Sequence, residues 1–123
     1  MRSKRDQIGW KGYLPAIVTP FGKDLQIDYP GLNVMLDWLV AEGMHGLVVA
    51  GTTGEWTSLS ASERADLFSA VGQRLAGKLP LIAGCTSFTG EEVLRFANHA
   101  AASRFDGILV TPPPYVQIGR AHV

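Results

Sequence analysis

The sequence contains one cysteine, no excess of either charge and no long apolar run. Its 123 residues include 11 basic and 11 acidic side chains, so its charge favours neither nucleic acid nor an acidic membrane as a partner. Cys85 alone cannot form an internal disulfide and fits a reducing compartment. No apolar run is long enough to span a membrane, and residues 1–11 lack the apolar core of a secretory signal. We therefore expect a cytoplasmic protein.

Common nucleotide and metal motifs are also missing. The sequence has no G-x-G-x-x-G fingerprint and no G-x-x-x-x-G-K-S/T loop, so nucleotide binding has no support. His45, His99 and His122 do not have the spacing of metal ligands. We expect neither a cofactor nor a bound metal.

What the sequence does contain is an alternation of apolar runs and helical patterns. Four apolar runs predict short strands, at 13–19, 46–50, 80–84 and 105–111. Between them lie three helical segments with start signals: Asp28 before Pro30, and the capping boxes Ser60–Glu63 and Thr89–Glu92. Such an alternation predicts right-handed βαβ crossovers and a parallel sheet. From the pattern alone, an open doubly wound sheet and a closed eightfold barrel both remain possible.

Helical spacing also predicts which side chains are buried. In the second helix the buried stripe is Phe68, Val71 and Leu75. In the third helix, small residues would face the sheet: Val93, Ala97, Ala100 and Ala101. Cys85 is expected to be a small buried hydrophobic residue.

The segment Gly51–Glu55, with the sequence Gly-Thr-Thr-Gly-Glu, follows the apolar run 46–50 directly. Gly51 and Gly54 can take positive φ and let main-chain N–H groups approach a ligand. Thr52 and Thr53 add two hydroxyls, and such a turn at the carboxyl end of a strand can seat a carboxylate or phosphate. An ordinary βα turn whose threonines cap the next segment explains the same residues, and both interpretations stay open at this point.

Several motifs in order resemble those of one enzyme family. They are Leu-Pro-Ala-Ile-Val-Thr-Pro-Phe at 14–21, Gly51–Glu55 with the following Ser-Leu-Ser at 58–60, Pro-Leu-Ile-Ala-Gly at 80–84 and Val-Thr-Pro-Pro at 110–113. Together they resemble the dihydrodipicolinate synthase and N-acetylneuraminate lyase family of Schiff-base aldolases, over residues 12–117. The Gly-Thr-Thr-Gly-Glu form of the turn favours the dihydrodipicolinate synthase side.

The resemblance implies an α/β fold, a partial (β/α)8 TIM barrel with about the first three βα units and the fourth strand. It also implies an enzyme that condenses a lysine of a later strand with pyruvate or another 2-oxo acid. Carried over, Thr53 and its N–H hold the substrate carboxylate in a seat that Gly51 and Gly54 complete, and the Thr52 hydroxyl joins a proton relay with tyrosines. Tyr115 is the candidate tyrosine, reaching across the interface of a homo-oligomer; packing against the proline turn is the alternative role.

The chain also departs from the family pattern. Three prolines precede Tyr115, and none of Lys4, Lys11, Lys23 and Lys78 can be assigned as the imine-forming lysine. A complete barrel needs about 250 residues, so we expect a lead-in at 1–11, half a barrel at 12–117 and a foreign or disordered tail at 118–123. Such a fragment would be inactive and would expose apolar edges at its first and fourth strands.

Two alternatives have a different character. One is a non-catalytic half-barrel module that completes itself by pairing, and the other is a small α/β domain that binds an anion.

Glu55 is interpreted as electrostatic support for the turn rather than a general base. Trp56 is expected at the rim of the turn. The second substrate cannot be inferred, so a biosynthetic synthase and a sugar-acid aldolase both stay open.

Overall fold

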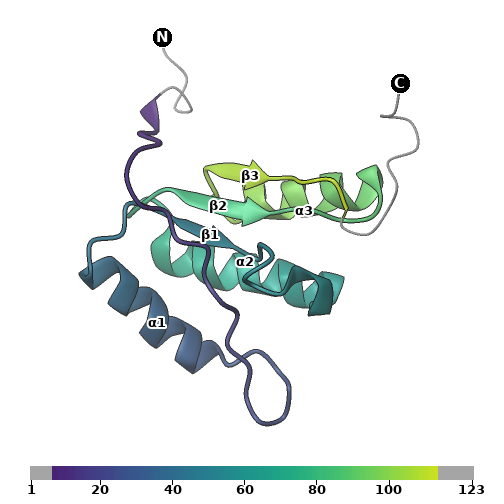
Figure 1. Ribbon diagram of the computed structural model, residues 1–123, viewed down its shortest axis with the longest axis horizontal. Coiled ribbons are helices and arrows are strands. Elements are labelled where there is room, and N and C mark those ends of the chain that lie inside the picture. The colour runs from purple at the N-terminus through teal and green to yellow at the C-terminus, as the bar shows by residue number, and fades with distance from the viewer. Residues whose placement is uncertain (1–6, 114–123) are drawn as a thin grey trace.

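The computed structural model describes residues 7–113, which form a parallel sheet with helices between the strands (Figure 1). The strands β1 (Leu47–Val49), β2 (Leu81–Gly84) and β3 (Gly107–Leu109) pair in the order β1-β2-β3. The helices α1 (Tyr29–Ala41), α2 (Ala61–Leu75) and α3 (Gly90–Ala102) alternate with them along the chain. Neighbouring strands are consecutive in sequence, without the reversal of strand order that defines a doubly wound sheet. This order confirms the α/β prediction and agrees with part of a barrel.

The helices begin where their capping residues predict. The Asp28 carboxylate accepts a hydrogen bond from the Gly31 N–H at 3.0 Å, with Pro30 in the first turn of α1. At the start of α2 the predicted capping box is complete. The Glu63 N–H donates to the Ser60 hydroxyl at 3.1 Å, and the Ser60 N–H donates to the Glu63 carboxylate at 2.9 Å. These bonds satisfy amides that the helix itself leaves unpaired.

The first predicted strand is reduced to an isolated bridge, in which Ala16 pairs with Val48 in parallel. The Ile17 N–H donates to the Val48 carbonyl at 2.9 Å, and the Val48 N–H donates to Pro15 at 2.9 Å. Because Pro15 has no N–H, it cannot donate to a longer ladder. The segment is also buried on one side only: Ile17 is buried, whereas Val18 is 51% exposed. It lies beside β1, on the edge that β2 does not occupy.

The core lies between the sheet and the helices. Phe68, Val71 and Leu75 of α2 are buried as predicted, with Leu47 and Leu81 of the strands. In α3 the prediction is partly wrong, because the buried residues are Phe96 and Ala100, while Ala101 is exposed. The larger phenyl ring takes the position facing α2, since it buries more apolar surface than a methyl group.

The last strand contrasts with the first two, because its side chains are largely open to solvent. Ile108 is 50% exposed and Leu109 is 44% exposed, whereas Leu47, Val49 and Leu81 have no exposed surface. Exposed apolar edges were predicted for a partial barrel, and the exposure of Val18 and Ile108 confirms them. No helix within residues 7–113 has both the length and the apolar character needed to cross a membrane.

Candidate carboxylate-binding site

The turn after β1 exposes hydroxyls and amides at the carboxyl end of that strand. Thr52 and Thr53 are exposed, while Gly51 and Gly54 on either side are buried. Within residues 7–113, neither threonine hydroxyl has a hydrogen-bond partner, and the N–H groups of Thr52, Thr53 and Gly54 have no acceptor. Successive free amides together with two hydroxyls are the groups that bind a small anion.

The backbone of this turn differs from the prediction, because positive φ falls on Ala50 (56°) and Glu55 (59°) rather than on the two glycines. A non-glycine residue in this region costs roughly 1–2 kcal/mol, so the surrounding structure must hold it there. Gly54 is favoured for another reason: a Cβ at this position would lie 3.0 Å from the Ala50 Cα, a tight contact with the backbone. A Cβ on Gly51 would meet only Val48 Cγ1 at 3.7 Å, an ordinary contact.

Two segments that are distant from the turn in sequence contact its backbone. The buried Thr19 hydroxyl donates to the Gly54 carbonyl at 2.7 Å, although these residues are 35 positions apart. Gly84 at the end of β2 lies so close that a Cβ there would overlap the Ala50 carbonyl. Sequence reasoning did not find either contact, because both join segments far apart in the chain.

The capping role proposed for the threonines as an alternative is wrong. A 3-10 helix, η2 (Trp56–Ser58), separates the turn from α2, and Ser60 caps α2 instead. Glu55 precedes η2, is exposed, and makes no side-chain capping bond. Trp56 was expected at the rim, but its side chain is buried with 5% exposed. The hydroxyls of Thr52 and Thr53 therefore do not cap a helix.

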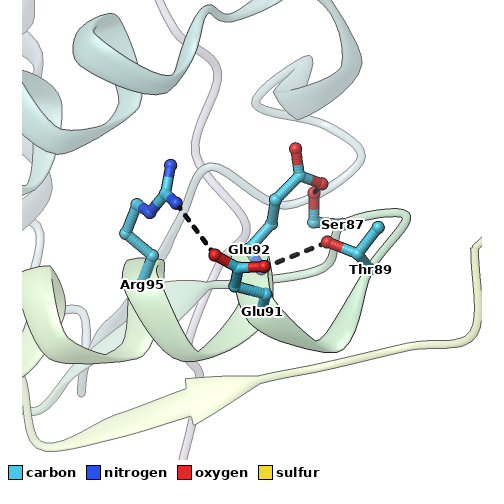
Figure 2. A network of polar contacts seen from close by, with 5 residues as sticks. All are labelled: Ser87, Thr89, Glu91, Glu92 and Arg95. Atoms are coloured by element: carbon cyan, nitrogen blue, oxygen red, sulfur yellow. Dashed lines mark hydrogen bonds and ion pairs between the residues drawn. The ribbon is translucent and has the colours of Figure 1, made fainter.

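In the turn after β2, side-chain hydroxyls form hydrogen bonds with other groups of the protein (Figure 2). The Ser87 hydroxyl donates to the Glu92 carboxylate at 2.6 Å, and this bond lowers the pKa of Glu92. The Glu92 N–H donates to the Thr89 hydroxyl at 3.2 Å. The capping box predicted at Thr89–Glu92 is thus only half formed, because the Glu92 carboxylate binds Ser87 instead of returning to the Thr89 backbone.

Arg64 is a buried residue that sequence reasoning missed. It lies on α2 with 2% of its surface exposed and donates to the Thr86 carbonyl at 2.8 Å. Burial lowers the pKa of Arg64, an effect that the nearby Cys85 and Glu92 oppose. A signal was present, because Arg64 lies four residues before Phe68 and so falls on the buried stripe of α2.

Of the remaining residues singled out from the sequence, some lie within residues 7–113 and others lie outside this range. Cys85 is buried as predicted, and its burial raises the pKa of the thiol to about 11. Tyr115 and the tail 118–123 lie outside the described residues. In the described part of the chain, no group of three or more His, Cys, Asp or Glu side chains could hold a metal ion. The structure thus brings together Gly51, Thr52, Thr53 and Gly54 in one turn.

Comparison with protein families gives a match that covers nearly the whole chain. The model of the dihydrodipicolinate synthetase family matches residues 9–122. The chain belongs to this family. Its curated relatives include the 4-hydroxy-tetrahydrodipicolinate synthases of Limosilactobacillus fermentum, 43% identical over 83% of this chain, and Methanosphaerula palustris, 40% identical over 91%. The chain covers 33% and 39% of these two proteins, so it spans about a third of their length.

Solved structures of the dihydrodipicolinate synthetase family agree with the fold. YagE, a prophage protein of this family from E. coli K12 in complex with pyruvate, is 29% identical and superposes with a TM-score of 0.86 over 92% of this chain. N-acetylneuraminate lyase from Mycoplasma synoviae is 32% identical, with a TM-score of 0.83 over 92% of this chain. The chain covers 38% and 40% of these two structures. The α/β architecture is therefore part of a TIM barrel.

Proposed function

We propose that this chain is part of a pyruvate-dependent Schiff-base lyase resembling dihydrodipicolinate synthase, and that it supplies the seat for the substrate carboxylate. The observation that carries the proposal is the turn after β1, where the amides of Thr52, Thr53 and Gly54 and two exposed hydroxyls have no partner among residues 7–113. The turn stands at the carboxyl end of a barrel strand, where such enzymes place their active sites. A pyruvate complex of the related YagE supports the choice of ligand.

In this proposal Thr53 binds the carboxylate through its hydroxyl and N–H, and Thr52 takes part in a proton relay with Tyr115. Imine formation needs a lysine that condenses with the ketone. Lys11, Lys23 and Lys78 lie in loops and turns, outside the helices and strands. The 123-residue chain therefore binds pyruvate weakly and forms no imine by itself. We also propose that residues 12–117 are the barrel part, that the parent enzyme is a cytoplasmic homo-oligomer, and that it uses no cofactor.

The binding step is tested by a pyruvate titration of the ¹⁵N-labelled chain, followed by NMR. We expect saturable shifts of the amides of Gly51–Gly54, and a Thr53→Val variant that keeps its fold but loses them. Lactate, which keeps the carboxylate without the ketone, is expected to bind similarly, because the seat recognises only the carboxylate. Absence of any shift in this turn would contradict the proposal.

The chemical step is tested by borohydride trapping with pyruvate, measured by intact mass. We expect no adduct on the 123-residue chain. An adduct is expected on a version completed with the remaining strands and helices of the Limosilactobacillus fermentum synthase, its 43% identical relative. If the completed protein folds and forms no adduct with pyruvate, the lyase assignment is wrong.

A second candidate is a non-catalytic half-barrel module that pairs with another copy. The exposed apolar side chains of Val18, Ile108 and Val110 favour it, because such edges gain stability when covered. Sedimentation at increasing concentration tests it. A monomer over the whole range would exclude the module.

A further inference from the structure

Arg64 is a charged side chain in the interior that forms no ion pair within residues 7–113, although Glu92 lies close enough to act on its charge. It is 2% exposed, and neither of the two ion pairs found within residues 7–113 includes it. Its partners are main-chain carbonyls. Nη1 donates to Thr86 at 2.8 Å and to Gly84 at 3.4 Å, and Nη2 donates to Trp56 at 3.4 Å.

Two aromatic rings enclose the guanidinium. Its central carbon lies 4.0 Å from the centre of the Phe96 ring and 5.0 Å from that of Trp56. Attraction between a cation and the face of an aromatic ring is strongest where water is excluded. These rings offset part of the cost of burying the charge, but Nε still has no acceptor in the described part of the chain.

Because burying a charge costs free energy, an arginine at this position indicates a role that an apolar side chain could not fill. A methionine or leucine at this position on the α2 stripe would fill the space without desolvating a charge, and such replacements of buried charges are often neutral or stabilising. An arginine adds directional donors, and here they reach two separate turns. The Trp56 carbonyl belongs to the segment that follows the candidate seat, the Gly84 carbonyl ends β2, and the Thr86 carbonyl belongs to the turn after β2.

We propose that Arg64 is a positioning residue of the carboxylate seat, holding the turn after β1 in register with the turn after β2. Its guanidinium binds the Trp56 carbonyl just after the turn, and Thr19 binds the Gly54 carbonyl two residues earlier, so both hold the carboxyl-terminal end of the turn. Thr86 extends the connection to the next strand, because its hydroxyl accepts from the Thr111 N–H at 2.9 Å. The inference rests on the proposed function, since it assigns Arg64 to the same site.

The test compares three variants of the 123-residue chain by NMR. Arg64→Met removes the donors and keeps similar volume, and Arg64→Lys keeps the charge with fewer directed donors. Arg74→Met is the matched control on the same helix, because Arg74 forms only an exposed pair with Asp37. Two properties are measured for each variant: the pyruvate dissociation constant from the shifts of Gly51–Gly54, and the amide hydrogen exchange of both turns.

A positioning role predicts a change in affinity beyond any change in stability. For folded Arg64→Met, we expect the pyruvate dissociation constant to rise about fivefold or more, since the seat is no longer pre-organised. Exchange of the hydrogen-bonded amides at the two turns, those of Glu55 and Trp56 after β1 and of Cys85 after β2, is expected to accelerate about tenfold relative to the interior of α1. In both measurements Arg64→Lys should give values between those of Arg64→Met and those of the unsubstituted 123-residue chain. Arg74→Met should give the same values as the unsubstituted chain.

Arg64→Met with a parent-like dissociation constant and parent-like exchange of the turns would overturn the inference and leave a purely structural arginine. If Arg64→Met does not fold, Arg64→Lys decides by the same two criteria. If the parent chain shows no pyruvate-dependent shifts, the proposed function fails by itself. The connection between the turns is then judged on exchange alone, and unchanged exchange in Arg64→Met would overturn it.

Discussion

The two turns at the carboxyl edge of the sheet contain the same residue types but use them differently. After β2, the hydroxyls of Thr86, Ser87 and Thr89 all form hydrogen bonds within the protein. After β1, Thr52 and Thr53 are exposed and have no partner among residues 7–113. The first set stabilises the fold, while the second is the one that the proposed function assigns to the substrate carboxylate.

The difference follows from what comes next along the chain. The turn after β2 leads directly into α3, so the Thr89 hydroxyl satisfies one of the first amides of that helix, the Glu92 N–H. The turn after β1 leads into η2, and Ser60 caps α2 beyond it. A short 3-10 helix thus releases Thr52 and Thr53 from capping. In the proposed function, binding depends on which polar groups the fold leaves unpaired, and the residue types alone do not decide it.

The largest effect is expected where the two turns touch. Gly84→Ala would place a methyl group against the Ala50 carbonyl, and we expect a loss of about 3 kcal/mol or more in the free energy of unfolding. Gly51→Ala is the matched control, because its Cβ has 3.7 Å to the nearest atom. Urea unfolding checks both variants. Equal stability of the two would show that the turns are not in close contact.

An effect nearly as large is expected at alkaline pH. Burial raises the pKa of Cys85 from 9.0 to about 11, so between these values the thiol ionises only in the unfolded chain. Below pH 9 the thiol is protonated in both states and does not change the free energy of unfolding. As the pH rises from 9 towards 11, ionisation stabilises only the unfolded chain, and the free energy of unfolding falls by up to about 3 kcal/mol.

The Cys85→Ala variant separates this thiol from other groups. Tyr29, whose pKa is also raised by burial, remains in the variant and contributes whatever alkaline loss is left. Urea midpoints measured from pH 8 to 11 should fall less steeply in Cys85→Ala than in the parent. Parallel curves would show that the buried thiol is not responsible.

A paired substitution tests the comparison directly. Thr86→Val removes the acceptor of the part-buried hydrogen bond from the Thr111 N–H, and we expect a loss of about 1 kcal/mol in stability. Thr52→Val removes an exposed hydroxyl, so its effect should stay within about 0.5 kcal/mol. Thermal unfolding with and without pyruvate provides the measurement. A larger stability loss in Thr52→Val would reverse the assignment of the two turns.

The smallest effect concerns a single carboxyl. Ser87→Ala removes the hydrogen bond that lowers the pKa of Glu92, so this pKa should rise towards its ordinary value. A lowered pKa stabilises the folded state above the ordinary value near 4.5, and this contribution is lost as the pH falls through the lowered one. ¹³C NMR titration of Glu92 checks the shift, with Glu91 as the internal control on the same helix turn.

Patterns local in sequence predicted the helices well. Capping by Asp28 and Ser60 was confirmed, and so was the buried stripe of α2. The location of the candidate seat at Gly51–Glu55 was also predicted, because an apolar run followed by glycines and threonines is a local signal. Its exposed hydroxyls and free amides agree with that prediction.

Contacts distant in sequence could not be predicted in the same way. The support of the seat by Thr19, Arg64 and Gly84 depends on segments that meet only after folding. The positive φ at Ala50 is another case, since it follows from close packing against Gly84 and not from the preference of alanine. Phe96 was missed because helical spacing permits several faces, and the neighbouring helix selects one of them.

The distance in sequence between the seat and its support has a consequence for the time course of synthesis. Thr86, which accepts the shortest hydrogen bond of Arg64, is translated roughly 30 residues after the turn, a delay of a few seconds at ordinary elongation rates. During that interval the nascent chain carries the turn without its second anchor. If Thr52 and Thr53 form the proposed carboxylate seat, this seat is complete only once the turn after β2 has been synthesised, and not when the two threonines emerge.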